Sequence, residues 1–68
     1  MRTTAGKRGD TYTARAAVLA LEKWFPRDRA ERIVAIAGTF GIKAEALPKG
    51  MVTVRLAGWG GYTIEVDE

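Results

Sequence analysis

Apolar and polar residues follow two different periods along the chain, and the change falls at Gly41. Before Gly41, apolar residues recur every three or four positions, which is the spacing of one face of a helix. After it, apolar and polar residues alternate one by one, which is typical of strands with one buried face. The sequence therefore predicts helices in the first part of the chain and a sheet in the second.

The first helix is expected over residues 13–25. Its apolar stripe consists of Ala14, Val18, Leu21 and Phe25, widened by Ala17 and Trp24. Asp10, Thr11 and Thr13 precede it and can each cap a helix N-terminus with a side-chain oxygen. Pro26 is expected to end the helix, because a proline disfavours the helical conformation of the residue before it.

A second helix is expected to begin near Asp28, which together with Glu31 resembles a capping box. Its predicted apolar stripe is Ala30, Ile33, Val34, Ala37 and Phe40. Gly41 is placed to close the helix in a left-handed conformation. The short link between the two helices predicts an antiparallel hairpin.

Three alternating runs predict three strands, and their expected inward residues are Ile42, Ala44 and Ala46; Val52, Val54 and Leu56; Tyr62, Ile64 and Val66. The expected outer face carries Lys43, Glu45, Thr53, Arg55, Thr63 and Glu65. Residues 47–50 suit a type I turn with a bulge, and the glycines of 57–61 suit a second turn. The predicted fold is α+β: a two-helix antiparallel hairpin packed on a three-stranded antiparallel β-meander (ααβββ), with residues 51–56 in the middle.

Residues 36–47 allow an alternative, because they resemble the helix-turn-helix pattern in their order of small and apolar residues. The recognition helix would then begin near Lys43. Pro48 argues against it, since a proline about one turn into a helix removes a hydrogen bond and clashes with the preceding turn. A strand over 42–46 is the preferred interpretation.

Residues 1–9 contain glycine, threonine and three basic side chains without an apolar period, and they predict a flexible basic arm. Residues 10–68 are expected to form the single ααβββ domain. The chain has no cysteine and no histidine, so a disulfide and the usual nitrogen and sulfur zinc ligands are excluded. Neither a metal nor a cofactor is expected.

The net charge of +3 is unevenly distributed. Residues 1–32 hold eight basic and four acidic side chains, and such an asymmetry favours contact with nucleic acid. A mobile basic arm can follow phosphates or enter a groove. The candidate nucleic-acid-binding residues are Arg2, Lys7, Arg8, Arg15, Arg27, Arg29 and Arg32. An ordinary solvated helix would also interleave Arg27, Arg29 and Arg32 with carboxylates.

Catalysis is not expected. The chain lacks Cys, His and Ser, which removes the common nucleophiles and bases. Asp28 and Glu31 are explained as helix caps, and the glycines of 58–61 precede a strand rather than the helix of a phosphate-binding loop.

Trp59 lies between glycines at the tip of the second predicted hairpin. An exposed tryptophan there can anchor an interface or stack on a base, and a buried one can cap the core. Both interpretations remain open. With Arg55 on the outer sheet face, Trp59 forms the candidate partner-binding set.

Two functions follow for a small non-catalytic binding protein. Nucleic-acid-binding regulation through the basic arm and the second-helix arginines is slightly favoured. The alternative is a protein-binding adaptor or inhibitor, similar to phage-encoded regulators only in its general features, that docks through the Trp59 hairpin or a sheet edge. Self-association to a homodimer through a strand edge also stays open. With no apolar run of membrane-spanning length or signal-peptide kind, we expect a cytoplasmic protein with no membrane contact.

Overall fold

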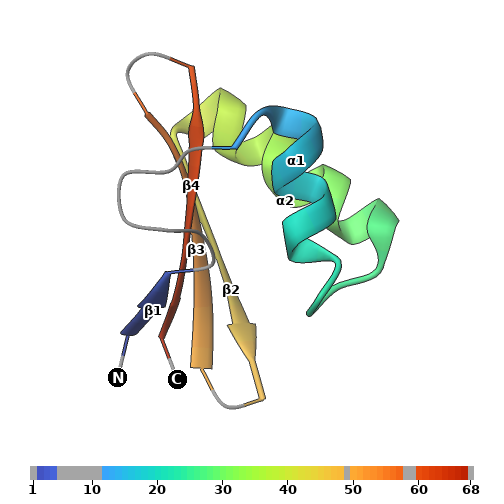
Figure 1. The fold of residues 1–68 in the computed structure, drawn as a ribbon, viewed down its shortest axis with the longest axis vertical. Coiled ribbons are helices and arrows are strands. Elements are labelled where there is room, and N and C mark those ends of the chain that lie inside the picture. The colour runs from blue at the N-terminus through green and yellow to red at the C-terminus, as the bar shows by residue number, and fades with distance from the viewer. Residues whose placement is uncertain (1, 5–11, 49, 58–59, 68) are drawn as a thin grey trace.

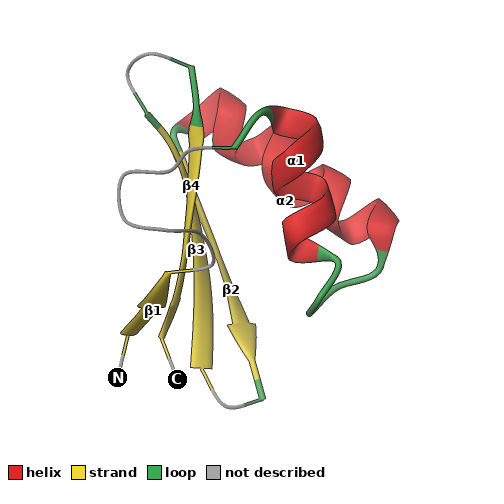
Figure 2. Ribbon diagram, in the orientation of Figure 1, coloured by secondary structure: helices red, strands yellow, loops and turns green. Residues whose placement is uncertain are grey.

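A computed structural model describes residues 2–4, 12–48, 50–57 and 60–67. Figures 1 and 2 show two helices on one side of an antiparallel sheet. In chain order the elements are β1 (Arg2–Thr4), α1 (Ala14–Leu21), α2 (Arg27–Phe40), β2 (Ile42–Leu47), β3 (Gly50–Leu56) and β4 (Tyr62–Asp67). The α+β fold with an ααβββ arrangement, predicted from the two periods, is confirmed.

The strand order in the sheet is β1-β4-β3-β2. The predicted meander is β2-β3-β4 with β3 in the middle, and β1 adds a fourth strand that the sequence did not indicate. In β1, Thr3 is opposite Val66 of β4. Residues 1 and 5–9 of the predicted arm lie outside the described residues, so the flexible arm stays a prediction.

Helix α1 begins where the sequence suggested and ends earlier. The Thr13 hydroxyl accepts a hydrogen bond from the Ala16 N–H at 3.1 Å, so Thr13 is the N-cap. Regular helix stops at Leu21 rather than at Phe25. The Trp24 N–H then donates to the Leu21 carbonyl at 3.0 Å, a tighter turn than an α-helix makes. Phe25 is nevertheless buried as predicted.

Helix α2 corrects two details of the prediction. It begins at Arg27 after Pro26, and no side chain caps its N-terminus, so the capping box of Asp28 and Glu31 is wrong. Asp28 lies in the first turn, where its charge favours the positive end of the helix dipole. Phe40 was expected in the core but is 77% exposed. Gly41 closes the helix as predicted, with a φ of 87°.

The core lies between the helical hairpin and the sheet. Its fully buried larger side chains are Leu21, Ile33, Ile64, Val52, Val54 and Val66. Three alanines, Val34 and Phe25 complete the cluster without polar groups, so apolar packing holds the two layers together. Each buried Leu, Ile or Val contributes about 1.5–3 kcal/mol to this packing before the loss of chain entropy is counted.

The inward and outward faces of β2 are the reverse of the prediction. Ile42, Ala44 and Ala46 are exposed, whereas Lys43, Glu45 and Leu47 are half-buried on the helix side. Pairing with β3 is unbroken from Ile42↔Arg55 to Leu47↔Gly50, which leaves only positions 48 and 49 between the strands. Because directly opposed residues share a face, Glu45 lies on the same side as buried Val52.

A bulge would have changed this outcome. One extra residue in β2 would shift its pairing by one position and turn Ile42, Ala44 and Ala46 inward. The predictions of a bulged turn and of an inward-facing Ile42, Ala44 and Ala46 are therefore both wrong, and for the same reason: the pairing of β2 with β3 contains no bulge. The strand itself is confirmed, and it replaces the recognition helix of the helix-turn-helix alternative.

Candidate functional site

The open edge of the sheet is formed by β2. Within the described residues no strand lies beyond it. The Leu56 N–H donates to the Gly41 carbonyl at 2.8 Å, which marks Gly41 and Leu56 as a hydrogen-bonded pair. In an antiparallel ladder such pairs alternate with pairs that are not bonded. The backbone groups of Lys43, Glu45 and Leu47 therefore point toward β3, and those of Ile42, Ala44 and Ala46 point away from the sheet.

The side chains on the outer face of this edge are apolar. Ile42 is 55% exposed, and Ala44 and Ala46 are exposed beside it along the strand. Met51, which is 46% exposed, is opposite Ala46 on β3. Single exposed apolar residues are common on proteins, but a row of them along an open strand is a typical site for another strand.

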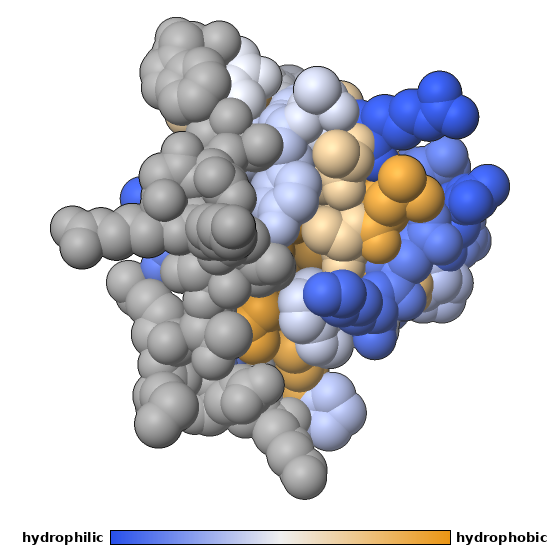
Figure 3. Space-filling model, in the orientation of Figure 1, coloured by the Kyte–Doolittle hydropathy of each residue, from blue (hydrophilic) through white to orange (hydrophobic). Residues whose placement is uncertain are grey.

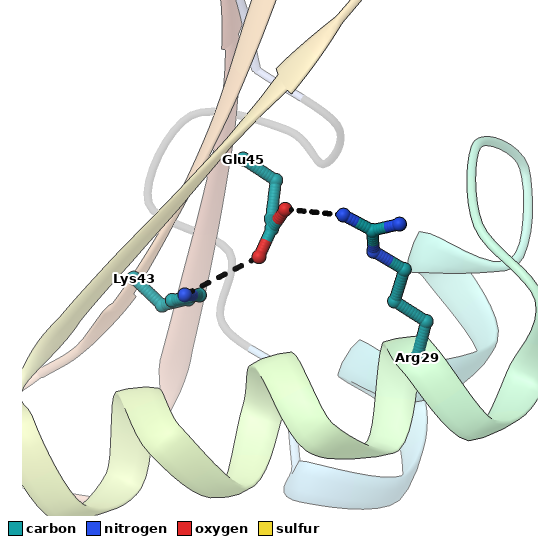
Figure 4. A network of polar contacts seen from close by, with 3 residues as sticks. All are labelled: Arg29, Lys43 and Glu45. Carbon is teal, nitrogen blue, oxygen red and sulfur yellow. Dashed lines mark hydrogen bonds and ion pairs between the residues drawn. The ribbon is translucent and has the colours of Figure 1, made fainter.

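The inner face of the same edge is charged. Glu45 accepts from the Arg29 guanidinium at 2.9 Å, and its second oxygen lies 3.3 Å from the Lys43 ammonium. Figure 4 shows the Glu45 carboxylate between Lys43 of its own strand and Arg29 of α2. The hydrogen bond from Arg29, helped by Lys43, lowers the pKa of Glu45. Arg29 is also 5.7 Å from the ring centroid of Phe25, so its position is set by two neighbours.

The opposite edge of the sheet is partly occupied by other segments of the chain. Tyr12 and Tyr62 exchange backbone hydrogen bonds of 2.9 and 2.8 Å, and β1 pairs with the other end of β4. The outer edge of β4 is thus occupied near both ends. The edge that β1 itself presents spans only three residues, and short edge strands are poor templates for pairing. β2 offers the longer edge in the described part of the chain.

The predicted nucleic-acid-binding residues on the helices are all exposed. Arg27 forms an ion pair with Glu22 at 3.2 Å, and Arg29 forms the pair with Glu45. The structure divides these arginines between two open grooves. One, of about 420 Å³, is lined by Arg15 and Arg27 together with Glu22 and Glu31. The other, of about 560 Å³ between α2 and β2, is lined by Arg29 and Arg32 together with Asp28, Glu45 and Lys43.

Acidic side chains accompany the arginines in both grooves, so neither is uniformly basic. Figure 3 has the helices on the right of the view, and apolar side chains lie over α1 there with hydrophilic side chains to their right and below. Helix α1 contributes Val18 and the exposed Leu19 to the first groove. The structure therefore does not gather the four helix arginines on one surface.

The remaining candidates are placed only in part. The backbone of Arg2 lies in β1, opposite Asp67. Lys7, Arg8 and Trp59 lie outside the described residues, and their assignments stay predictions. Arg55 is exposed on the outer sheet face, between Ile42 and Thr63 on the neighbouring strands.

The sequence did not identify Lys43 and Glu45 as parts of a site. Their spacing of two residues was visible and places them on one face of a strand. The missing information was which face that would be. The register with β3 decides it, and only that register brings Arg29 of α2 onto Glu45.

No group of three His, Cys, Asp or Glu side chains among the described residues is arranged to hold a metal ion. The helices in that part of the chain are also too short to cross a membrane, the longest being α2 with 14 residues. Comparison with known family models, curated proteins and solved structures finds no match. The candidate site is therefore argued from its geometry alone.

Proposed function

We propose that this protein is a non-catalytic protein-binding module whose β2 edge takes up an extended segment of a partner. The observation that carries the proposal is the orientation of Ile42, Ala44 and Ala46, whose backbone N–H and C=O groups point away from the sheet at its edge. Strand addition obtains affinity from such groups and specificity from alternate side chains. A role as an adaptor or inhibitor follows from this binding mode.

The charged pair limits which strands can bind. Inward-pointing charges on an edge strand normally prevent pairing, because an added strand would bury them. Here Lys43 and Glu45 have opposite signs and are two residues apart. An antiparallel partner with an acidic residue opposite Lys43 and a basic residue opposite Glu45 satisfies both. A strand with the opposite charge order places like charges opposite Lys43 and Glu45, and this repulsion is a means of specificity.

Nucleic-acid binding is the second candidate. It is supported by the exposure of Arg15, Arg27, Arg29 and Arg32 on the helices and by the basic residues of the N-terminal region. It is weakened by the carboxylates in both grooves and by the ion pairs of Arg27 and Arg29. Strand addition needs no rearrangement of such pairs, and we therefore favour the protein partner.

A displayed library of random peptides tests the first candidate. We expect the protein to enrich peptides that alternate apolar residues with a basic residue at i and an acidic residue at i+2, because an antiparallel strand lies opposite Glu45 first and opposite Lys43 two residues later. The variant Ala44→Pro removes an N–H that points away from β3, so it should abolish enrichment and leave the β2–β3 ladder intact. Ala44→Thr keeps the N–H and serves as the matched control. Enrichment that Ala44→Pro does not reduce contradicts the proposal, and so does enrichment without that charge order.

Hydrogen exchange gives a second readout of the same site. On binding a selected peptide, the amide protons of Ile42, Ala44 and Ala46 should gain protection, while those of Lys43, Glu45 and Leu47 are already protected by β3. Uniform protection along β2 would contradict strand addition.

Duplex and single-stranded DNA, titrated at low and moderate salt with tryptophan emission as the signal, test the second candidate. Tight binding that weakens steeply with salt would favour it.

A further inference from the structure

We infer that the partner taken up by the β2 edge is a second copy of this chain, paired antiparallel about a two-fold axis that passes through Ala44. This inference rests on the proposed function, because it names the strand that fills the edge. It is carried by the order of residues along β2 and by the direction of their backbone groups.

The backbone permits this pairing. Two antiparallel copies centred on Ala44 place Ala44 opposite its own copy and Ile42 opposite the copy's Ala46. These are the residues whose N–H and C=O groups point away from β3. Each pair can therefore exchange two hydrogen bonds, and the two sheets become one continuous sheet with the helices of both copies on the same face.

The charges select this register among its neighbours. Centred on Ala44, Lys43 of each copy lies opposite Glu45 of the other, in the closer, non-bonded type of pair. A shift that centres the axis on Lys43 places two ammonium groups opposite each other. The shift in the other direction does the same with two carboxylates at Glu45. Of these three registers, only the one centred on Ala44 places an acidic residue opposite Lys43 and a basic residue opposite Glu45.

The surroundings of the edge suit a second copy. On the outer face, Ile42 and the two alanines of each copy adjoin those of the other, and the apolar row is doubled. On the inner face, the groove between α2 and β2 leaves about 560 Å³ beside Lys43 and Glu45. Arg29 approaches Glu45 from the helix side, so the other carboxylate oxygen, which Lys43 contacts, faces along the strand (Figure 4).

The first test measures the mass of the full chain by light scattering and sedimentation over a range up to millimolar concentration. We expect a monomer–dimer equilibrium that Ala44→Pro abolishes and Ala44→Thr retains. Lys43→Glu alone and Glu45→Lys alone should each weaken the dimer about tenfold, because two symmetric pairs become repulsive. An equimolar mixture of these two variants should recover the dimer, since every cross-pair is again attractive.

The second test determines the register. The chain has no cysteine, so single variants Ile42→Cys, Ala44→Cys and Ala46→Cys can each carry one spin label. Pairing centred on Ala44 gives the shortest inter-label distance at 44 and equal, longer distances at 42 and 46, where the Cα separation along the strand is about 13 Å. Equal inter-label distances at 42 and 44, or at 44 and 46, indicate a shifted register and overturn the assignment. Three equal distances indicate parallel pairing and overturn it as well.

A wild-type chain that stays monomeric overturns the inference of a dimer. The proposed function is then tested by the peptide selection alone. If the selection also fails, strand addition itself is wrong. A dimer that persists in Ala44→Pro shows that the copies meet elsewhere, and it too overturns the inference. Circular dichroism on every variant, and amide protection of Lys43, Glu45 and Leu47, establish that the monomer is still folded.

Discussion

Gly38 of α2 and Tyr62 of β4 approach so closely that a side chain at position 38 would require the tyrosine hydroxyl to move. A Cβ built on Gly38 would lie 2.6 Å from the Tyr62 hydroxyl oxygen and 3.7 Å from the ring carbon that carries it. The contact lies near the end of α2, where the Tyr62 side chain lies against the core. Gly38 is thus a packing position inside the helix.

Gly38→Ala tests this contact. Alanine favours a helix over glycine by about 1 kcal/mol, but displacing the tyrosine costs about 1–3 kcal/mol as overpacking does elsewhere. We expect a net loss of about 1 kcal/mol in the free energy of unfolding, measured by urea denaturation. In the Tyr62→Phe background, which lacks the hydroxyl, the same substitution should instead stabilise the protein. Equal effects in both backgrounds would show that the hydroxyl is not the obstacle.

Gly41 offers a contrast, because a Cβ there meets nothing within 4 Å while its φ is +87°. The cost of Gly41→Ala is therefore conformational, and we expect a loss of about 1–2 kcal/mol in denaturation experiments. A synthetic chain with D-alanine at this position should lose little stability, since a D-residue favours positive φ. If D-alanine destabilises as much as L-alanine, the backbone conformation is not the cause.

Thr13 is the cap of a short helix, and its hydroxyl accepts from the Ala16 N–H. Thr13→Ala should lower the free energy of unfolding by about 1 kcal/mol, because that N–H loses its partner. Thr13→Ser retains the oxygen and should cost only a few tenths of a kcal/mol. The comparison is made by thermal and urea denaturation, and similar losses in the two variants would exclude capping as the reason.

Glu45 makes stability depend on pH. Its pKa is lowered in the folded chain, first by the hydrogen bond from Arg29 and then by Lys43. Because the folded pKa lies below the unfolded one, this stabilisation is complete above the unfolded value of about 4.3 and is lost as the pH falls through the folded value. Arg29 is largely exposed, so we expect only about 1 kcal/mol or less.

Glu45→Gln should therefore lower stability near neutral pH and make the unfolding free energy less dependent on pH below about 4.3. The measurement is made in the Ala44→Pro background, so that association between copies does not contribute. A variant that keeps the full wild-type pH dependence would show that the Arg29 and Lys43 contacts do not lower the pKa of Glu45.

The sequence by itself determined the number and order of the main elements. The change of period at Gly41, the caps at Thr13 and Gly41, and the inward residues of β3 and β4 were all readable, because they depend on local conformation and on strands buried on one complete face. The sequence also predicted that β2 is an outer strand of the meander. Charge and residue content indicated a binding role but named neither partner nor surface.

Only the tertiary structure decided which face of β2 meets the helices. At an edge strand the inner face is half-open, so Lys43 and Glu45 can lie over the core with their charges paired and in contact with solvent. The register of β2 is imposed by a connection of two residues to β3 and by pairing without a bulge. The burial preference of Ile42 and two alanines is too weak to shift this register. That register depends on a partner strand and on Arg29 from another element, and no pattern within residues 42–47 contains either.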